Sequence, residues 1–589
     1  MHFLCFDVSP GTVFFGSTQD GPAYQERKIL LSLTSERPVP RVAYFCMEYG
    51  LHEDFRTYAG GLGILAGDYL KAAHDLGLPV VGIGLLWRQG YTKQLIDENG
   101  RPFDAYPNYD YDFLRDTGVR VTVEVRNRPV ICRVWLVDKF GNAPLYLLDT
   151  NLPENQDRLI TGQLYGWFGE ERVAQEIVLG IGGVRALRAL GIPIDVYHFN
   201  EGHAALAGLE LIREKMAADG LTFDEAWRRT RAEIVFTTHT PVKEGNEAHY
   251  HALLRYMGAY NGLEYEQMNA IGGDPFNMTV AGLRLSRLSN GVSELHGRTA
   301  RRMWADVTGA SPILAVTNGV HNSTWQDERV RGAYEHGGDV WEAHVAAKRE
   351  LVAEIEARTG TVLNADNLLI GFARRAAPYK RSDLIFRRPE AIEPALASGR
   401  IQIVFSGKSH PQDDTGKGIV ANLVAMMRRY PNSVVFLPDY DMEIGRVLTR
   451  GADIWLNNPV RPLEACGTSG MKAAMNGVLN VSVLDGWWPE GCEDGRNGWQ
   501  IGDGYEGHGQ DEHDLNSLYH VLFDEVIPTY YDDQARWRDM MRASIAMAER
   551  RFSAERMLKE YYELMYAAPA ESTREAAREA AATDGDRQA

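Results

Sequence analysis

Leu368-Leu369-Ile370-Gly371-Phe372-Ala373 is a short apolar run, and the residues after it, Arg374-Arg375-Ala376-Ala377-Pro378-Tyr379-Lys380-Arg381, bring four cations together. A continuous apolar run of this length is typical of a strand buried in a parallel sheet. Ligands of such sheets collect at the carboxyl ends of the strands, and Arg and Lys side chains bind phosphate well. The stretch therefore predicts a parallel sheet with an oxyanion site at its edge. A solvated basic surface paired with carboxylates is the alternative.

Similar apolar runs alternate with helical patterns along most of the chain, which indicates βαβ units and mainly parallel sheets. The runs form two series. The first series is 42–45, 80–84, 196–199, 234–237 and 313–316, and the second is 368–372, 401–405, 434–437, 454–456 and 478–481. We therefore predict an α/β fold with two Rossmann-like, doubly wound domains that face each other across a cleft.

A second informative stretch is Glu464-Ala465-Cys466-Gly467-Thr468-Ser469-Gly470-Met471-Lys472, which places a lysine just inside a predicted helix with a glycine-rich start. Free amides at a helix N-terminus favour an anion, and small residues let it approach closely. Lys472 can supply a Schiff-base amine, so the stretch indicates pyridoxal 5′-phosphate. The alternatives are an ordinary loop-to-helix junction with a solvated lysine, and a structural salt bridge for Glu464.

Further polar groups follow other predicted strands or open a helix. Gly60 and Gly61 begin a helix and suit a phosphate, although a simple turn is the alternative. The segments 198–203 and 238–241 offer polar side chains to sugar hydroxyls, and Asn318 does so too unless Asn318-Gly319 is only a turn. A metal site at His198, Glu201 and His203 is a weaker alternative because the spacing is not that of a helical HExxH motif. We therefore expect no metal.

Composition limits the classes of function. The chain has 589 residues, which is too long for a single hydrophobic core. Its net charge of -18 argues against nucleic acid or an anionic membrane as partner.

The cysteines are five in number, widely spaced and without a CxxC pair: Cys5, Cys46, Cys132, Cys466 and Cys492. They indicate neither disulfides nor a zinc ribbon, and we read no signal peptide in Met1 to Pro10 and no membrane helix. A cytoplasmic protein is expected. The absence of a Walker motif and of a nucleophile elbow gives little support to NTPase or hydrolase functions.

Taken together, these motifs resemble the α-glucan phosphorylases, which act on glycogen, starch or maltodextrin and have the two-domain GT-B fold. The resemblance runs from about Val42 to Tyr566. The matching segments occur in family order: 60–63, 200–203, 238–240, 318–320, Arg375 with 379–381, 407–408, and 464–472 with 476–477. Several matching islands in order make this a specific signal.

The resemblance implies roles for individual residues. The residues implied to be catalytic are Lys472, Arg375, Lys380 and His239. Those implied to bind the cofactor are Lys472, Thr468, Gly467, Gly60, Gly61 and Arg374. Those implied to bind the substrates are Glu464, Cys466, Asn318, Tyr379, Arg375 and Lys380. The lysine would hold the cofactor covalently, and Arg375 and Lys380 would bind inorganic phosphate or the phosphate of glucose 1-phosphate.

The implied reaction is reversible, retaining phosphorolysis of α-1,4-glucans from the non-reducing end, in which the phosphate of pyridoxal phosphate relays a proton. A homodimer is expected, as in most of the family. Arg374 stands where animal members have lysine, Cys466 replaces the usual serine, and the chain is short, so nucleotide or phosphorylation control is not expected. Residues 149–169 resemble a loop that closes over the site. A glycogen synthase-type transferase and a non-catalytic glucan-binding protein are the alternatives, but neither needs Lys472.

The predicted domain boundary lies near Gly360, after a charged amphipathic helix at about 340–357. We assign 1–355 to an N-terminal Rossmann-like domain with the glycine loop and glucan-binding face, and 356–545 to a C-terminal Rossmann-like domain that binds pyridoxal phosphate. Residues 546–566 are expected to form a helix that packs back toward the N-terminal domain. Residues 567–589 lack apolar anchors and are expected to be a disordered tail.

Overall fold

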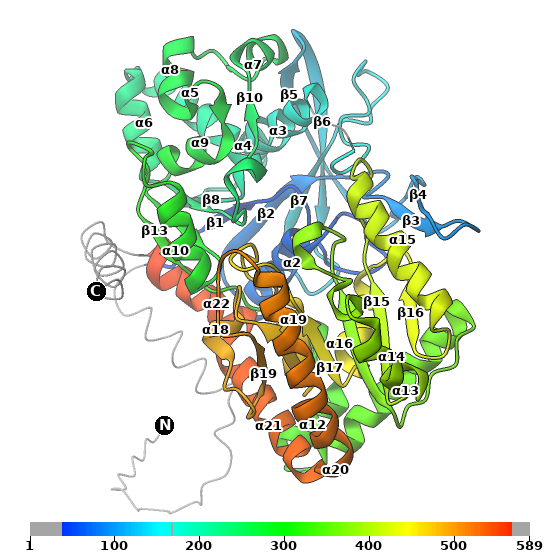
Figure 1. The fold of residues 1–589 in the computed structure, drawn as a ribbon. Coiled ribbons are helices and arrows are strands. Elements are labelled where there is room, and N and C mark those ends of the chain that lie inside the picture. The colour runs from blue at the N-terminus through cyan, green and yellow to red at the C-terminus, as the bar shows by residue number, and fades with distance from the viewer. Residues whose placement is uncertain (1–37, 167–168, 568–589) are drawn as a thin grey trace, which may run out of the picture. The chain divides into compact units, whose positions relative to one another are not determined.

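The structure is a computed structural model that describes residues 38–166 and 169–567 (Figure 1). Two large sheets with helices packed against them make up residues 41–567. The expected tail, apart from Ala567, and the segment 1–10 lie outside the described residues. The expectation of a mixed α/β fold with parallel sheets is confirmed.

Within the described residues, the first sheet has nine strands in the order β13-β12-β9-β8-β1-β2-β7-β6-β5. Their bounds are β1 Val42–Phe45, β2 Val80–Leu85, β5 Arg115–Val125, β6 Arg128–Val137, β7 Leu145–Asp149, β8 Val196–Asn200, β9 Ile234–Thr237, β12 Leu288–Gly291 and β13 Ile313–Ala315. Strands β13 to β7 are parallel, whereas β6 runs antiparallel to both β7 and β5. All five runs of the first predicted series are strands of this sheet.

The second sheet is entirely parallel, and its six described strands have the order β16-β15-β14-β17-β18-β19. Their bounds are β14 Leu368–Ala373, β15 Ile401–Ser406, β16 Val434–Leu437, β17 Ile454–Asn457, β18 Leu479–Val483 and β19 Gly498–Ile501. The five predicted runs are confirmed. Two small antiparallel pairs complete the strands: β3 Lys93–Ile96 with β4 Pro102–Ala105, and β10 Ala248–His249 with β11 Phe276–Asn277.

The helices connect these strands. Those before residue 336 are α2 Gly61–Asp75, α3 Glu170–Ile177, α4 Gly183–Ala189, α5 Leu206–Asp219, α6 Phe223–Arg231, α7 His251–Met257, α8 Tyr265–Gly272, α9 Met278–Leu285, α10 Glu294–Met303, α11 Asn322–Trp325 and α12 Glu328–Glu335. Those after it are α13 Val340–Thr359, α14 Pro389–Ala397, α15 Asp414–Arg429, α16 Met442–Gly451, α17 Ser469–Met475, α18 Trp488–Gly491, α19 Gln510–His520, α20 Ile527–Asp532, α21 Gln534–Arg551 and α22 Ala554–Glu560. Each large sheet has its own hydrophobic cluster.

Helix α13 is the charged helix that the sequence predicts between the two series of strands. Its N-cap is Asp339, whose side chain accepts from the amide of Trp341, and it ends at Gly360, which has a left-handed φ of 72°. The buried Lys348 donates to Asp453 at 2.6 Å. Because Asp453 directly precedes β17, this ion pair fixes α13 to the second sheet.

The last described segment, α22 and the π-helical turn Tyr561–Tyr566, lies against the first sheet. The hydroxyl of Tyr566 is 2.7 Å from that of Tyr69 and 2.6 Å from Nδ1 of His198. The hydroxyl of Tyr561 accepts from Asn290 Nδ2 at 3.0 Å. Distant residues of the chain thus satisfy polar groups that the sheet buries.

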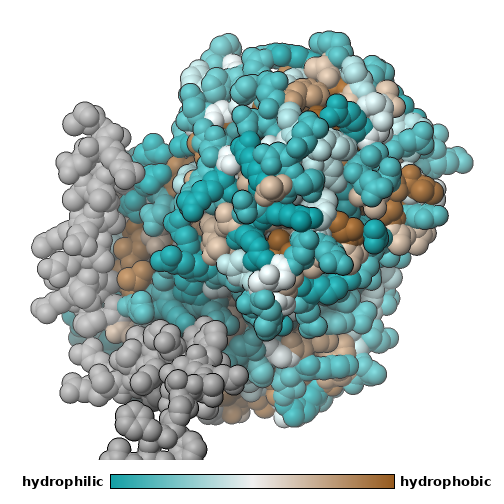
Figure 2. Space-filling model, turned by 90° about the horizontal axis from the view of Figure 1, so that it is seen from below, coloured by the Kyte–Doolittle hydropathy of each residue, from teal (hydrophilic) through white to brown (hydrophobic). Residues whose placement is uncertain are grey.

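Figure 2 shows one face of the molecule, which is mainly hydrophilic and on which hydrophobic residues occur in small, separate groups. Among residues 38–166 and 169–567, no helix combines the length and the hydropathy that crossing a membrane requires.

Candidate active site

Lys472 lies in α17 with its side chain buried. Its Nζ is 3.6 Å from the centroid of the Trp325 ring, and Trp325 donates its indole N–H to Asp68 at 2.9 Å. Burial lowers the pKa of Lys472 to about 8, and Asp68 acts in the opposite direction. The hydrogen bonds found among the described residues include none from this Nζ. A buried amine of lowered pKa that stacks on a ring is suited to react with an aldehyde.

Glu464 is held by two of the predicted cations. Its Oε2 accepts from Arg374 at 2.5 Å and from Lys380, while its own amide donates to Asp485 at 2.9 Å. Burial acts to raise the pKa of the Glu464 carboxyl, but Arg374 and Lys380 hold that pKa below its usual value. Glu464 therefore makes the ion pairs that were the alternative to a sugar contact. One nitrogen of Arg374, NH1, is buried and has no partner among the described residues.

The other two cations of the stretch after β14 differ from each other. Arg375 is exposed and interacts with the side chain of Tyr379. The ring of Tyr379 also lies beside Lys380, whose Nζ is 4.6 Å from the ring centroid. Arg381 is buried and donates to Asp514 at 2.6 Å and to the carbonyl of Pro459 at 2.6 Å. Arg381 is thus part of the scaffold, and Arg375 is the cation that faces solvent.

The glycine loop opens α2 as predicted. The amides of Ala59 and Gly60 donate to Oε2 of Glu48, at 2.6 and 3.1 Å. The amide of Gly61, the first residue of the helix, has no intrahelical acceptor. A Cβ built at either glycine would meet nothing within 4 Å, so both glycines border open space. Unlike that of Gly60, the amide of Gly61 donates to no acceptor in the described part of the chain, so it is available for an anion.

His239 follows β9 and is tightly held. Its amide donates to Glu201 at 2.7 Å, and its Nε2 lies 2.6 Å from Oδ1 of Asn200. Burial lowers the pKa of His239 to about 3, so the ring is neutral at pH 7. Glu201 itself has a φ of 78°, a strained conformation that is common at functional sites. The weaker metal alternative fails at His198, because Tyr566 and Thr237 engage both of its ring nitrogens.

Asn318 and the loop before Lys472 bring the two sheets together. The Oδ1 of Asn318 is buried and lacks a partner among the described residues, and the buried Cys466 thiol lies near its backbone. Ser293 Oγ, beyond β12, donates to the carbonyl of Ala465 at 2.7 Å. Thr468 occupies the N-cap position of α17 but makes no capping hydrogen bond, so its hydroxyl is not used by the helix.

Comparison with known proteins identifies the family. A model of the carbohydrate phosphorylase family matches residues 335–490. The chain is 39% identical over 586 residues to the maltodextrin phosphorylase of Thermococcus litoralis, which covers 89% of this chain and 70% of that protein. The chain belongs to the carbohydrate phosphorylase family. It is also 39% identical to the glycogen phosphorylase of Mycobacterium tuberculosis, over 91% of this chain and 72% of the relative, and 35% identical to that of Aquifex aeolicus, over 92% and 88%.

Sequence reasoning missed several residues of this phosphorylase site. Asp68 stands in the apolar start of α2, and a buried acid there signals a partner. The partner, Trp325, carries no such signal because its role depends on the packing of α11 against α17. Glu48 and Asp485, which accept from the glycine loop and from the Glu464 amide, were also missed.

The residues of this phosphorylase fit pyridoxal phosphate on three observations. Lys472 offers a buried amine with lowered pKa. The glycines at the start of α2 border open space into which a side chain would project. The buried NH1 of Arg374 lacks an acceptor, and a phosphate oxygen would supply one.

Proposed function

We propose that this phosphorylase transfers glucosyl units from the non-reducing end of α-1,4-glucans to inorganic phosphate. The product is α-glucose 1-phosphate, the reaction is reversible and retaining, and the cofactor is pyridoxal 5′-phosphate. The observation that carries the proposal is the buried amine of Lys472, which donates no hydrogen bond among the described residues, in the segment whose Glu464 holds two of the cations that follow β14. The printed names of the relatives, maltodextrin phosphorylase and glycogen phosphorylase, support the class of substrate.

When bound, pyridoxal phosphate supplies a phosphate group that exchanges a proton with the substrate phosphate. Lys472 would hold the cofactor covalently. The Thr468 hydroxyl, which the helix does not use, and the amides of Gly467 and Gly61 would donate to its phosphate. Arg374 adds the unpartnered NH1. These donors fix the anion at one place, and the cations beside it allow a second phosphate to approach.

The substrate phosphate binds to Arg375 and Lys380. Arg375 is exposed and therefore accessible to phosphate from solution, whereas Lys380 forms an ion pair with Glu464 before phosphate binds. A phosphate that takes over Lys380 weakens this ion pair and leaves Glu464 Oε2 as an acceptor for a sugar hydroxyl. Binding of phosphate thus prepares Glu464 for the glucosyl unit, together with Tyr379.

His239 positions the glucosyl unit as a neutral ring. Asn200 Oδ1 accepts from Nε2, so this nitrogen carries the proton. The pKa of about 3 keeps the ring uncharged, and Nδ1 is consequently an acceptor for a sugar hydroxyl. Asn318, with its unpartnered buried Oδ1, contacts the same sugar from a strand end of the first sheet, and Cys466 does so from the loop after β17 of the second sheet.

For the architecture we propose the GT-B arrangement, with the N-terminal domain ending near residue 355 and the cofactor domain spanning 356–545. Separate hydrophobic clusters support two domains, and the cluster of the second sheet begins before this boundary because it includes Val330 and Val340. The origin of the site in strand ends of both sheets also supports two domains. A homodimer stays a prediction from the resemblance, and a cytoplasmic location stays a prediction from the cysteine pattern.

The test is to incubate the purified protein with maltodextrin and phosphate, to measure glucose 1-phosphate, and to scan its absorbance for bound pyridoxal. We expect product only when phosphate is present. A parallel reaction with a nucleotide-sugar donor tests the synthase alternative. Protein without a pyridoxal band and without phosphate-dependent product would contradict the proposal.

Uptake of the cofactor should depend on pH in a particular direction. The neutral amine of Lys472 is the reactive form, and its fraction rises tenfold per pH unit below the pKa of about 8 and then levels. We therefore expect the rate at which cofactor-free protein takes up pyridoxal phosphate to rise from about pH 6 and to level by about pH 9. Absorbance of the bound cofactor measures this rate. A tenfold rise per unit that continues to about pH 10 would indicate an ordinary lysine instead.

A further inference from the structure

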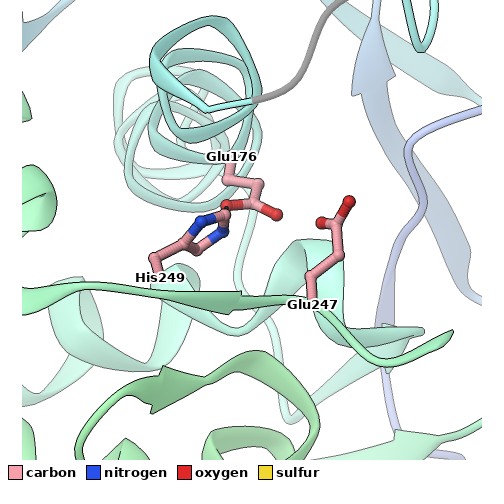
Figure 3. Close-up of side chains that lie close together, drawn as sticks. All are labelled: Glu176, Glu247 and His249. Atoms are coloured by element: carbon pink, nitrogen blue, oxygen red, sulfur yellow. Dashed lines mark hydrogen bonds and ion pairs between the residues drawn. The ribbon is translucent and has the colours of Figure 1, made fainter. Parts of the chain in front are cut away.

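Outside the residues discussed above, Glu176, Glu247 and His249 converge on one point (Figure 3). Glu176 comes from α3, while Glu247 and His249 flank or lie in β10. Nε2 of His249 is 3.0 Å from Oε2 of Glu176, and one ligand atom from each of the three residues lies within 4.8 Å of the others.

Two carboxylate oxygens of this cluster have no donor. Glu176 is fully buried, and its Oε1 has no partner among the described residues. Oε2 of Glu247 also lacks a hydrogen bond, because Arg172 donates to the other oxygen, Oε1. Since an unsatisfied buried acceptor is costly, these oxygens are suited to a cation, a shared proton or a buried water.

The surrounding charge is negative. Burial raises the pKa of Glu176 to about 7, and burial together with a neighbouring carboxylate raises the pKa values of Glu201 and Glu247. Arg172 is a cation beside both Glu176 and Glu247, and His203 is neutral, since burial lowers its pKa to about 4. The two carboxylates of the cluster together carry more negative charge than this one guanidinium balances, which favours a bound cation.

The separations suit a metal ion. Ligands about 2.1 Å from an ion lie about 3.0 Å apart at right angles and about 4.2 Å apart across it. The 3.0 Å between Nε2 of His249 and Oε2 of Glu176 equals the separation expected at right angles. A small side-chain movement would bring the ligand atom of Glu247, within 4.8 Å of the others, to a ligand separation as well. One imidazole and two carboxylates are typical ligands of Zn²⁺ and Mn²⁺. Nε2 of His203, 3.9 Å from Glu247 Oε2, is placed to become a further ligand.

We propose that Glu176, Glu247 and His249 bind one divalent transition-metal ion. The ion would join α3 to the segment that leads from His239 to β10. Its role is therefore to position the loop after β9, not to take part in phosphoryl or glucosyl transfer. The competing occupant is a proton shared by the two carboxyl groups.

The test uses holoenzyme stripped with EDTA, gel-filtered and titrated with Co²⁺, whose visible absorption bands report nitrogen and oxygen ligation. We expect about one Co²⁺ per chain, with binding at least about 100-fold weaker in Glu176→Gln and in His249→Gln. The exposed His336 provides the matched control, and His336→Gln should bind as the wild type does. Zn²⁺ retained after gel filtration, measured by mass spectrometry, should follow the same order.

Wild-type protein that gives no Co²⁺ bands and retains no Zn²⁺ would overturn the proposal and leave the shared proton. Bands that persist in both folded variants would also overturn it, because the ion would then lie elsewhere. If a variant does not fold, the wild-type titration alone decides the outcome.

Discussion

Lys472→Ala should yield a folded protein that neither retains pyridoxal nor forms glucose 1-phosphate. Without the amine there is no covalent attachment, and we expect activity to fall by at least about 10³-fold, as when a covalent catalytic residue is removed. The fold should survive because Lys472 forms no ion pair among the described residues, so its removal breaks no salt bridge. Asp68 keeps the indole hydrogen bond of Trp325. Absorbance after gel filtration, circular dichroism and the product assay measure the three outcomes.

Lys472→Arg is the matched control for charge and size. Arginine keeps a cation over the Trp325 ring but has no free amine, so this variant should lose pyridoxal as completely as the alanine variant. Retained cofactor and undiminished turnover in either variant would show that another lysine holds the cofactor.

The second large effect is expected for Lys380→Met. We expect the kcat/KM for phosphate to fall by about 10²- to 10³-fold, because a cation aimed at the transferred phosphate is lost from a buried site. Glu464 remains paired with Arg374, so the protein should still fold, although it loses the contribution of the Lys380–Glu464 ion pair to stability. Lys417→Met is the control, since Lys417 forms a partly exposed ion pair with Asp104. Initial rates at varied phosphate concentration measure the effect.

A double-mutant cycle with Glu464→Gln separates the ion pair from the phosphate contact. The cycle measures the free energy of unfolding of the wild type, the two single variants and the double variant. Close charge pairs have coupling free energies of at least about 1.5 kcal/mol, and we expect Lys380 and Glu464 to reach this value. If the two substitutions instead add independently and phosphate kinetics stay normal, Lys380 does not bind the substrate phosphate.

Much of the fold follows from short-range pattern. Buried parallel strands are continuous apolar runs, and each of the ten predicted runs is a strand. Strand β12 was missed because Leu288-Ser289-Asn290-Gly291 is polar, and its burial depends on partners from elsewhere, such as Tyr561 for Asn290. The antiparallel pair β5 and β6 lies at the edge of the sheet, where alternating polar residues weaken the apolar signal.

The candidate site likewise combines local motifs that the sequence predicts with long-range contacts that it does not. The phosphate loops and Lys472 are local patterns, so the sequence predicts them. The ion pairs of Glu464 join residues 84 and 90 positions apart, and the contact of Trp325 with Asp68 joins residues 257 apart. Only tertiary packing sets such contacts, and it also decides which of the four cations after β14 is structural.

The hydrogen bond between His198 and Tyr566 spans 368 residues. A ribosome that adds about 5–20 residues per second makes the tyrosine roughly 20–70 s after the histidine. During that interval the strand ends at His198, Thr237 and Asn290 lack the hydroxyl groups that later satisfy them. The first sheet to be translated is therefore the last to have its buried polar groups satisfied.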